Sequence, residues 1–156
     1  MQFKKLTLAL SAILLVIFSA CSSNKDKVNA ISIFSFKIDN VLYQSNATTA
    51  FITDTLYAGK KTLIIDGLTN NFRNHMELMI TFPDTIGTGT FENMVEMAVM
   101  NIEPKENGYV DKTVTVNITS INNRHAEGTF SGVLINGEIE KPLTDGTFKV
   151  EILDHQ

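Results

Sequence analysis

The stretch KTVTVNITSI, residues 112–121, decides the fold class of this chain. Its apolar side chains recur at every second position, as Val114, Val116 and Ile118, and threonine or asparagine fills the positions between them. Successive side chains of a β-strand point to opposite faces, so a period of two gives one apolar and one polar face. The stretch therefore predicts a strand with one face buried and the other in water.

The same alternation recurs on both sides of this stretch. It is clearest in SIFSFKID (residues 32–39), HMELMITF (75–82) and GTFKVEIL (146–153). The residues expected to point inward are Phe34, Phe36, Ile38, Met76, Leu78, Ile80, Phe82, Phe148, Val150 and Ile152; those expected to point outward include His75, Glu77 and Thr81. Turns are predicted at Asp39-Asn40, 58–61, Asn122-Asn123 and Asn136-Gly137.

These segments predict an all-β domain over residues 31–156, an antiparallel meander of about 8–10 strands. A single open sheet would leave its apolar face wet and its edges unpaired. The sheet must therefore close into a β-barrel or pack on a second sheet as a β-sandwich, and the sequence leaves that choice open.

Residues 92–103 fit two structures. Met94, Met97, Ala98 and Asn101 would share one face of a helix, whereas Val95, Met97 and Val99 would share one face of a strand. The neighbouring segments are strands and this one stops at a proline, so a strand is favoured.

The first 20 residues have the parts of a secretory signal peptide. Lys4 and Lys5 precede an uncharged, mostly apolar run at 6–20, and the chain turns polar directly after Cys21. As a helix this run is shorter than the roughly 30 Å hydrocarbon core, so a permanent membrane span is disfavoured. Residues 21–30 are polar without periodicity and are expected to form a flexible tether.

Phe18, Ser19, Ala20 and Cys21 resemble the lipobox of bacterial lipoproteins. That resemblance implies cleavage before Cys21 and transfer of a diacylglycerol to its thiol. Two or more acyl chains hold a protein stably at a membrane. We therefore expect an exported protein anchored by lipid to a bacterial membrane, the outer membrane being the expected one, on its periplasmic or its cell-surface face.

The charge of the chain bears on its partners. The 136 residues after residue 20 carry 11 basic and 17 acidic side chains, a net charge of −6. Binding to nucleic acid requires a basic surface that displaces phosphate counterions. The composition therefore argues against a nucleic-acid partner.

Further short motifs resemble small lipoproteins of Bacteroidota that are classed only as domains of unknown function. They are FSFKIDNVLYQS (residues 34–45), IGTGTF (86–91), HAEGTFSGVL (125–134) and LTDGTFKVEI (143–152). The resemblance covers nearly all of the chain after the tether. It implies an all-β lipoprotein and carries over no catalytic residue.

The sequence offers little to an enzyme, a metal or a cofactor. His75, His125 and His155 stand at no usual metal-ligand spacing. The segment GTFSG, residues 128–132, has Phe130 where a nucleophile elbow would place its serine. We expect no catalysis, no cofactor and no bound metal.

Five methionines lie in two neighbouring segments, and flexible thioethers can either fill a core or line an adaptable apolar pocket. They are Met76, Met79, Met94, Met97 and Met100. The favoured function is a membrane-anchored, non-catalytic interaction or accessory module of the cell envelope, with an unknown envelope protein as its partner. The alternative is a lipocalin-like carrier of a small apolar ligand, for which the methionines would line the cavity.

Overall fold

The computed structural model describes residues 32–103 and 108–153, and regular structure in this part of the chain consists of strands alone. The predicted all-β fold is thereby confirmed. The strands are β1 (Ile33–Ile38), β2 (Val41–Ser45), β3 (Thr48–Tyr57), β4 (Lys60–Leu68), β5 (Asn74–Thr81), β6 (Gly89–Phe91), β7 (Val95–Asn101), β8 (Tyr109–Asn122), β9 (His125–Asn136) and β10 (Ile139–Leu153).

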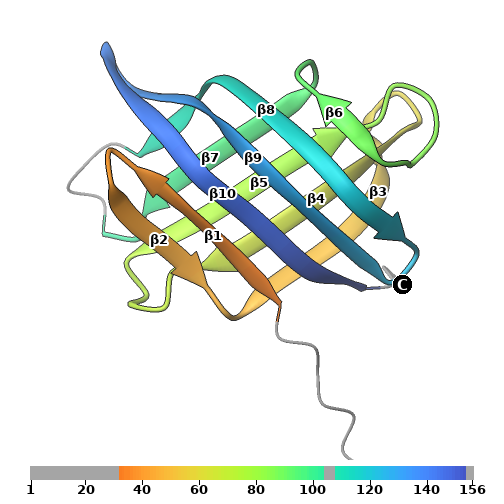
Figure 1. Cartoon of the computed structure of the whole chain (residues 1–156), viewed down its shortest axis with the longest axis horizontal. Helices are drawn as coiled ribbons and strands as arrows, with labels where there is room; N and C mark the ends of the chain where they lie inside the picture. Colours follow the sequence, from red (N-terminus) through yellow and green to blue (C-terminus); the bar gives the residue numbers. More distant parts are fainter. Residues whose placement is uncertain (1–31, 104–107, 154–156) are drawn as a thin grey trace, which may run out of the picture.

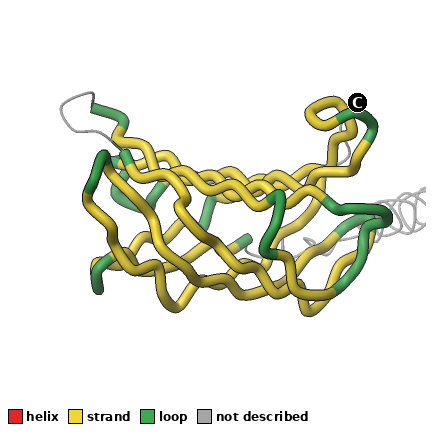
Figure 2. Tube along the Cα trace, turned by 90° about the horizontal axis from the view of Figure 1, so that it is seen from above, coloured by secondary structure: helices red, strands yellow, loops and turns green. Residues whose placement is uncertain are grey.

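The strands form one sheet that closes on itself. Its order is β2-β1-β10-β3-β4-β5-β7-β8-β6, and β9 closes the ring by pairing with both β8 and β10. Figures 1 and 2 show the ring flattened into two layers, with β1, β10, β9 and β8 crossing over β3, β4, β5 and β7. The fold thus combines the closure of a barrel with the two layers of a sandwich.

Closure requires departures from a simple meander. The long strand β10 pairs with β1 through residues 143–149 and then, in parallel, with β3 through Ile152 and Leu153. On the opposite side, β7 meets β8 through only two residue pairs, and the short β6 pairs further along the same edge of β8, opposite Val116, Asn117 and Ile118. These two junctions are the seams between the layers.

The predicted inward faces form one core between the layers. Phe34, Phe36 and Ile38 are at most 2% exposed, and the apolar residues of β5, β8 and β10 join them in one cluster. Thr81 departs from the predicted outward position because it is buried. Its hydroxyl hydrogen-bonds the hydroxyl of Thr62 at 2.9 Å, and its N–H donates to the carbonyl of Met94 at 3.0 Å.

Residues 95–101 form strand β7, so the strand favoured for this segment is confirmed. Val95, Met97 and Val99 are its buried residues, as the strand pattern required. Its antiparallel partner β5 is buried on the matching face, and Leu78 stands opposite Met97. Pairing with β5, whose own sequence alternates clearly, selects the strand period of two for residues 95–101 over the helical period that the sequence also allowed.

Two-residue turns connect most neighbouring strands. Asp39 and Asn40 both have positive φ, 49° and 66°, the pattern of a type I′ hairpin turn. The two later hairpins are confirmed but lie one residue further on than predicted, with turn residues 123–124 and 137–138. The reason is that Asn122 and Asn136 form the last rungs of their ladders, opposite His125 and Ile139.

The repeated Gly-Thr-Phe motif has a packing explanation. In the β9–β10 ladder, Gly128 stands opposite Phe148 and Phe130 stands opposite Gly146, so each glycine lies beside a phenylalanine of the other strand. A Cβ added at Gly128 would lie 2.5 Å from Phe148 Cζ, and one at Gly146 would lie 2.6 Å from the Phe130 ring. Two bulky rings therefore fit side by side in the core because glycines make room for them.

The N-terminal predictions lie outside the described residues. The signal peptide, the lipobox residues Phe18, Ser19, Ala20 and Cys21, and the tether all precede residue 32. Within the described ranges, no helix is long and apolar enough to cross a membrane.

Candidate functional site

Two adjoining hollows lie at one end of the flattened ring. They measure about 570 Å³ and 410 Å³ and share Tyr43, Arg73 and Asn74 in their walls. We call the combined surface, which comprises residues 41–44, 69–74 and 101–103, the end groove. It is formed by β2, by the β4–β5 loop and by the end of β7, three segments that are distant in sequence.

The β4–β5 loop is held in one conformation by Thr69. Its carbonyl accepts from the N–H of Phe72 at 2.7 Å, and its own N–H donates to Asn74 at 2.9 Å. Its hydroxyl oxygen also accepts from the backbone N–H groups of Arg73 and Asn74, at 3.2 and 3.0 Å. The loop thereby presents a fixed backbone to the groove.

Phe72 is the most unusual residue of this loop. Its φ is +58°, a left-handed conformation that a bulky side chain seldom adopts, and its side chain is 72% exposed. An aromatic ring in water contributes little to the stability of the fold, although the left-handed backbone costs about 1–2 kcal/mol. Strain retained at an exposed aromatic residue points to a binding role for that residue.

Arg73 stands beside it at the junction of the two hollows and is exposed to solvent. Among the described residues, no carboxylate forms an ion pair with its guanidinium. Its backbone is fixed, because its carbonyl accepts the N–H of Ile102 at 2.9 Å. The groove thus contains an aromatic ring and a cation, both on rigid backbone.

The opposite wall is fixed by the β1–β2 hairpin. The N–H of Asp39 donates to the carbonyl of Pro142 at 3.1 Å, and its carboxylate pairs with Lys141 at 2.5 Å. The pKa of Lys141 is raised above its ordinary value, first by the hydrogen bond from its ammonium group to the Asp39 carboxylate and second by the negative charge of that carboxylate. Within the hairpin, Phe36 of β1 stands opposite Tyr43 of β2, and their rings are stacked with centroids 5.5 Å apart. Both walls of the groove are therefore preformed.

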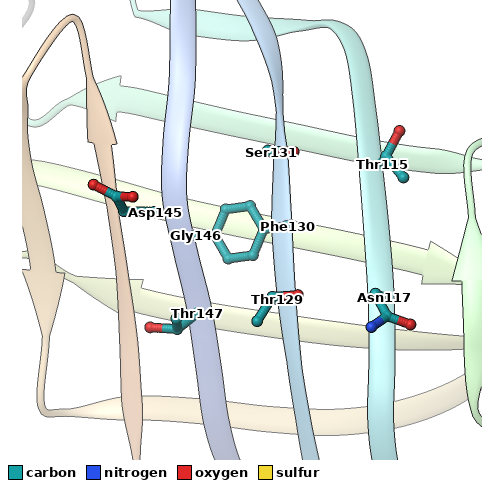
Figure 3. Close-up of a pocket in the computed structure, with 8 residues that line it drawn as sticks. All are labelled: Thr115, Asn117, Thr129, Phe130, Ser131, Asp145, Gly146 and Thr147. Atoms are coloured by element: carbon teal, nitrogen blue, oxygen red, sulfur yellow. The ribbon is translucent and has the colours of Figure 1, made fainter.

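A third hollow, of about 460 Å³, lies over the bulge of β10 (Figure 3). Hydroxyl and amide side chains surround the ring of Phe130, and the bulge residue Asp145 has a φ of +54°. Its carboxylate is already paired with Lys37 at 2.9 Å. The exposed ring of Phe72 and a cation without an ion-pair partner in the described part of the chain make the end groove the stronger candidate.

The structure does not gather the five methionines into one pocket. Met76 and Met97 are buried in the core, 0% and 2% exposed, whereas Met79, Met94 and Met100 lie outside it, half-buried or exposed. The Sδ atom of Met94 accepts a hydrogen bond from Lys60 Nζ at 3.5 Å.

The two described histidines are both paired. His75 contacts Asp66 at 2.5 Å and His125 contacts Glu127 at 2.7 Å, while His155 lies outside the described residues. No group of three His, Cys, Asp or Glu side chains in the described ranges is arranged to hold a metal ion.

Sequence reasoning missed Phe72 and Arg73. The available signal was the segment TNNFRN, residues 69–74, in which one aromatic and one basic residue interrupt a polar loop between two strands. Comparison with family models, curated proteins and solved structures found no match.

Proposed function

We propose that the chain is a lipid-anchored, non-catalytic interaction module of the bacterial cell envelope that binds a partner at the end groove. The anchor is supported by the lipobox-like residues 18–21, and the binding role is supported by Phe72, a strained and exposed aromatic residue. Aromatic residues, phenylalanine among them, and arginine are enriched at the cores of protein interfaces relative to the rest of the surface.

The alternative, a carrier of a small apolar ligand, lacks such support. Carriers of this kind hold the ligand in an open cavity inside the barrel. Here Phe34, Phe36, Phe130 and Phe148 meet in the interior, with ring centroids 5.5–6.5 Å apart. A ligand would have to displace close-packed core side chains.

The anchor is tested by intact-mass analysis and membrane fractionation of the natural chain and of Cys21→Ser, with Ser23→Ala as a control. We expect the natural chain and the control to begin at residue 21, carry acyl groups and sediment with membranes. Cys21→Ser should lack acyl groups and keep residues 1–20. A natural chain that is unacylated, or that keeps residues 1–20, contradicts the anchor.

The binding role is tested by placing a photoreactive phenylalanine analogue at position 72 in living cells. Leu56 is the control position, because it is 50% exposed and lies on β3, outside the groove. We expect defined crosslinked species from position 72 and none of them from position 56. Identical patterns from the two positions would remove the end groove from the proposal.

A further inference from the structure

The geometry points to an extended peptide segment bearing a carboxylate as the occupant of the end groove, bound by addition as a strand to the free edge of β2. This inference rests on the proposed function and specifies its partner class. An extended peptide that pairs with a sheet edge obtains affinity from backbone hydrogen bonds and specificity from pockets for alternate side chains.

β2 is an edge strand, since it ends the strand order and pairs with β1. Ile38 and Val41 flank the two-residue turn and form its hydrogen-bonded pair, so the backbone groups of every second residue of β2 point at β1. Those of Leu42 and Gln44 consequently point away from the sheet. The carbonyl of Gln44 shows this direction, because it accepts the N–H of Asn70 at 2.8 Å.

The smaller hollow follows this edge. It is lined by the four consecutive residues 41–44 on one side and by loop residues 69–71, 73 and 74 on the other. Consecutive strand residues point to opposite faces, so a hollow that touches all four lies along the edge and not over one face. The outward N–H and carbonyl of Leu42 therefore border it.

The β4–β5 loop covers this edge at Gln44, whose carbonyl accepts the N–H of Asn70, but the edge at Leu42 lacks the usual protection against pairing. Edge strands are commonly shielded by lysine, proline, a bulge or very short length. The sequence of β2, VLYQS, contains no lysine and no proline, and its register with β1 is unbroken. Val41 and Leu42 are each 58% exposed, whereas the other edge strand, β6, has only three residues. An open edge beside a rigid loop is suited to receive a strand.

Charge and apolar surface specify the peptide further. Arg73 borders both hollows, whereas Glu103 lines only the larger one, so a carboxylate on a strand added at the smaller hollow would form a bidentate, charge-assisted hydrogen bond with Arg73. Phe72 offers an exposed ring to an apolar side chain of the same strand. The expected ligand alternates apolar and polar residues and carries an Asp, a Glu or a free C-terminus at the Arg73 end.

The test uses the full-length chain in detergent micelles and a displayed library of random ten-residue peptides. Enriched peptides are synthesised and their Kd values are measured by fluorescence polarisation. Leu42→Pro removes the outward N–H and is compatible with an edge strand, whereas Leu42→Ala keeps the N–H and shortens the side chain. Arg73→Gln removes the charge.

We expect acidic, alternating peptides to be enriched. Leu42→Pro should weaken their binding about tenfold, the value of one lost backbone hydrogen bond, and Leu42→Ala should weaken it less than about threefold. Arg73→Gln should weaken binding and reduce its salt dependence. In the natural chain, bound peptide should slow amide exchange at Leu42 and leave Tyr43, already paired with β1, unchanged. This last measurement decides the question if Leu42→Pro fails to fold.

Three results would overturn the inference. The first is enriched peptides whose Kd is unchanged by Leu42→Pro and whose binding leaves amide exchange at Leu42 unchanged. The second is a library that enriches no peptide while oligosaccharides bind the groove. The third is a dimer formed through β2 that Leu42→Pro dissociates. If the natural chain is acylated and position 72 gives specific crosslinks but peptides do not bind, the proposed interaction module is retained and only the inferred class of partner is wrong.

Discussion

Replacing Gly128 by alanine should destabilise the protein by roughly 1–3.5 kcal/mol. The added Cβ would lie 2.5 Å from Phe148 Cζ and 2.7 Å from the carbonyl oxygen of Asn117. Relieving both contacts requires the ring to move within a filled core and β8 to move away from β9. Overpacking of a core costs about 1–3 kcal/mol and a lost ladder hydrogen bond about 1 kcal/mol. The loss of glycine freedom in the unfolded chain offsets only about 0.4–1 kcal/mol.

Equilibrium urea unfolding followed by far-UV circular dichroism measures this change. Gly87→Ala is the matched control, because the nearest atom to its added Cβ is the Thr85 carbonyl oxygen at 4.0 Å. The control should leave stability unchanged or raise it by up to about 1 kcal/mol. In a Phe148→Leu background, Gly128→Ala should cost less than in the natural chain, since the ring is one of the two obstacles. Equal stability of the two alanine variants would refute the reciprocal Gly-Phe packing.

Two further substitutions test individual contacts. Thr62→Val should lower the free energy of unfolding by about 1–3 kcal/mol, because it leaves the buried hydroxyl of Thr81 without its partner. The double variant Thr62→Val, Thr81→Val should be nearly as stable as the natural chain. Additive costs of the two substitutions in urea unfolding would contradict the buried hydroxyl pair. Phe72→Gly should stabilise the protein by about 0.5–1 kcal/mol in the same assay, because relief of the left-handed backbone exceeds the entropy lost by glycine. A loss of stability would show that the exposed ring is structural.

Much of the fold could be predicted because it depends on local alternation. The inward residues of β1, β8 and β10 follow directly from a period of two, and the Asp39-Asn40 turn follows from residues that tolerate positive φ. Thr81 could not be predicted, because its burial arises from Thr62 on the neighbouring strand and from the backbone of Met94. The one-residue shift of the later hairpins likewise depends on which pair forms the last rung of the ladder.

The end groove could not be predicted from the sequence. Its walls come from residues 41–44, 69–74 and 101–103, and no sequence pattern indicates that these segments meet. The five methionines are close together in the sequence, which suggested that they line one pocket, but the structure separates them. Strand alternation places Met76 and Met97 inside and leaves Met79, Met94 and Met100 outside the core. Grouping along the chain does not imply grouping in space when successive side chains point in opposite directions.

The sequence by itself determined that this protein is built of strands and which residues form their apolar faces, because both are encoded by neighbours in the chain. Only the tertiary structure decided how the sheet closes, through the pairing of β10 with both β9 and β3. It also decided that β2 ends the strand order and lies beside the loop that carries Phe72 and Arg73. The physical reason is that closure and edges depend on hydrogen bonds between distant segments, which no local periodicity specifies.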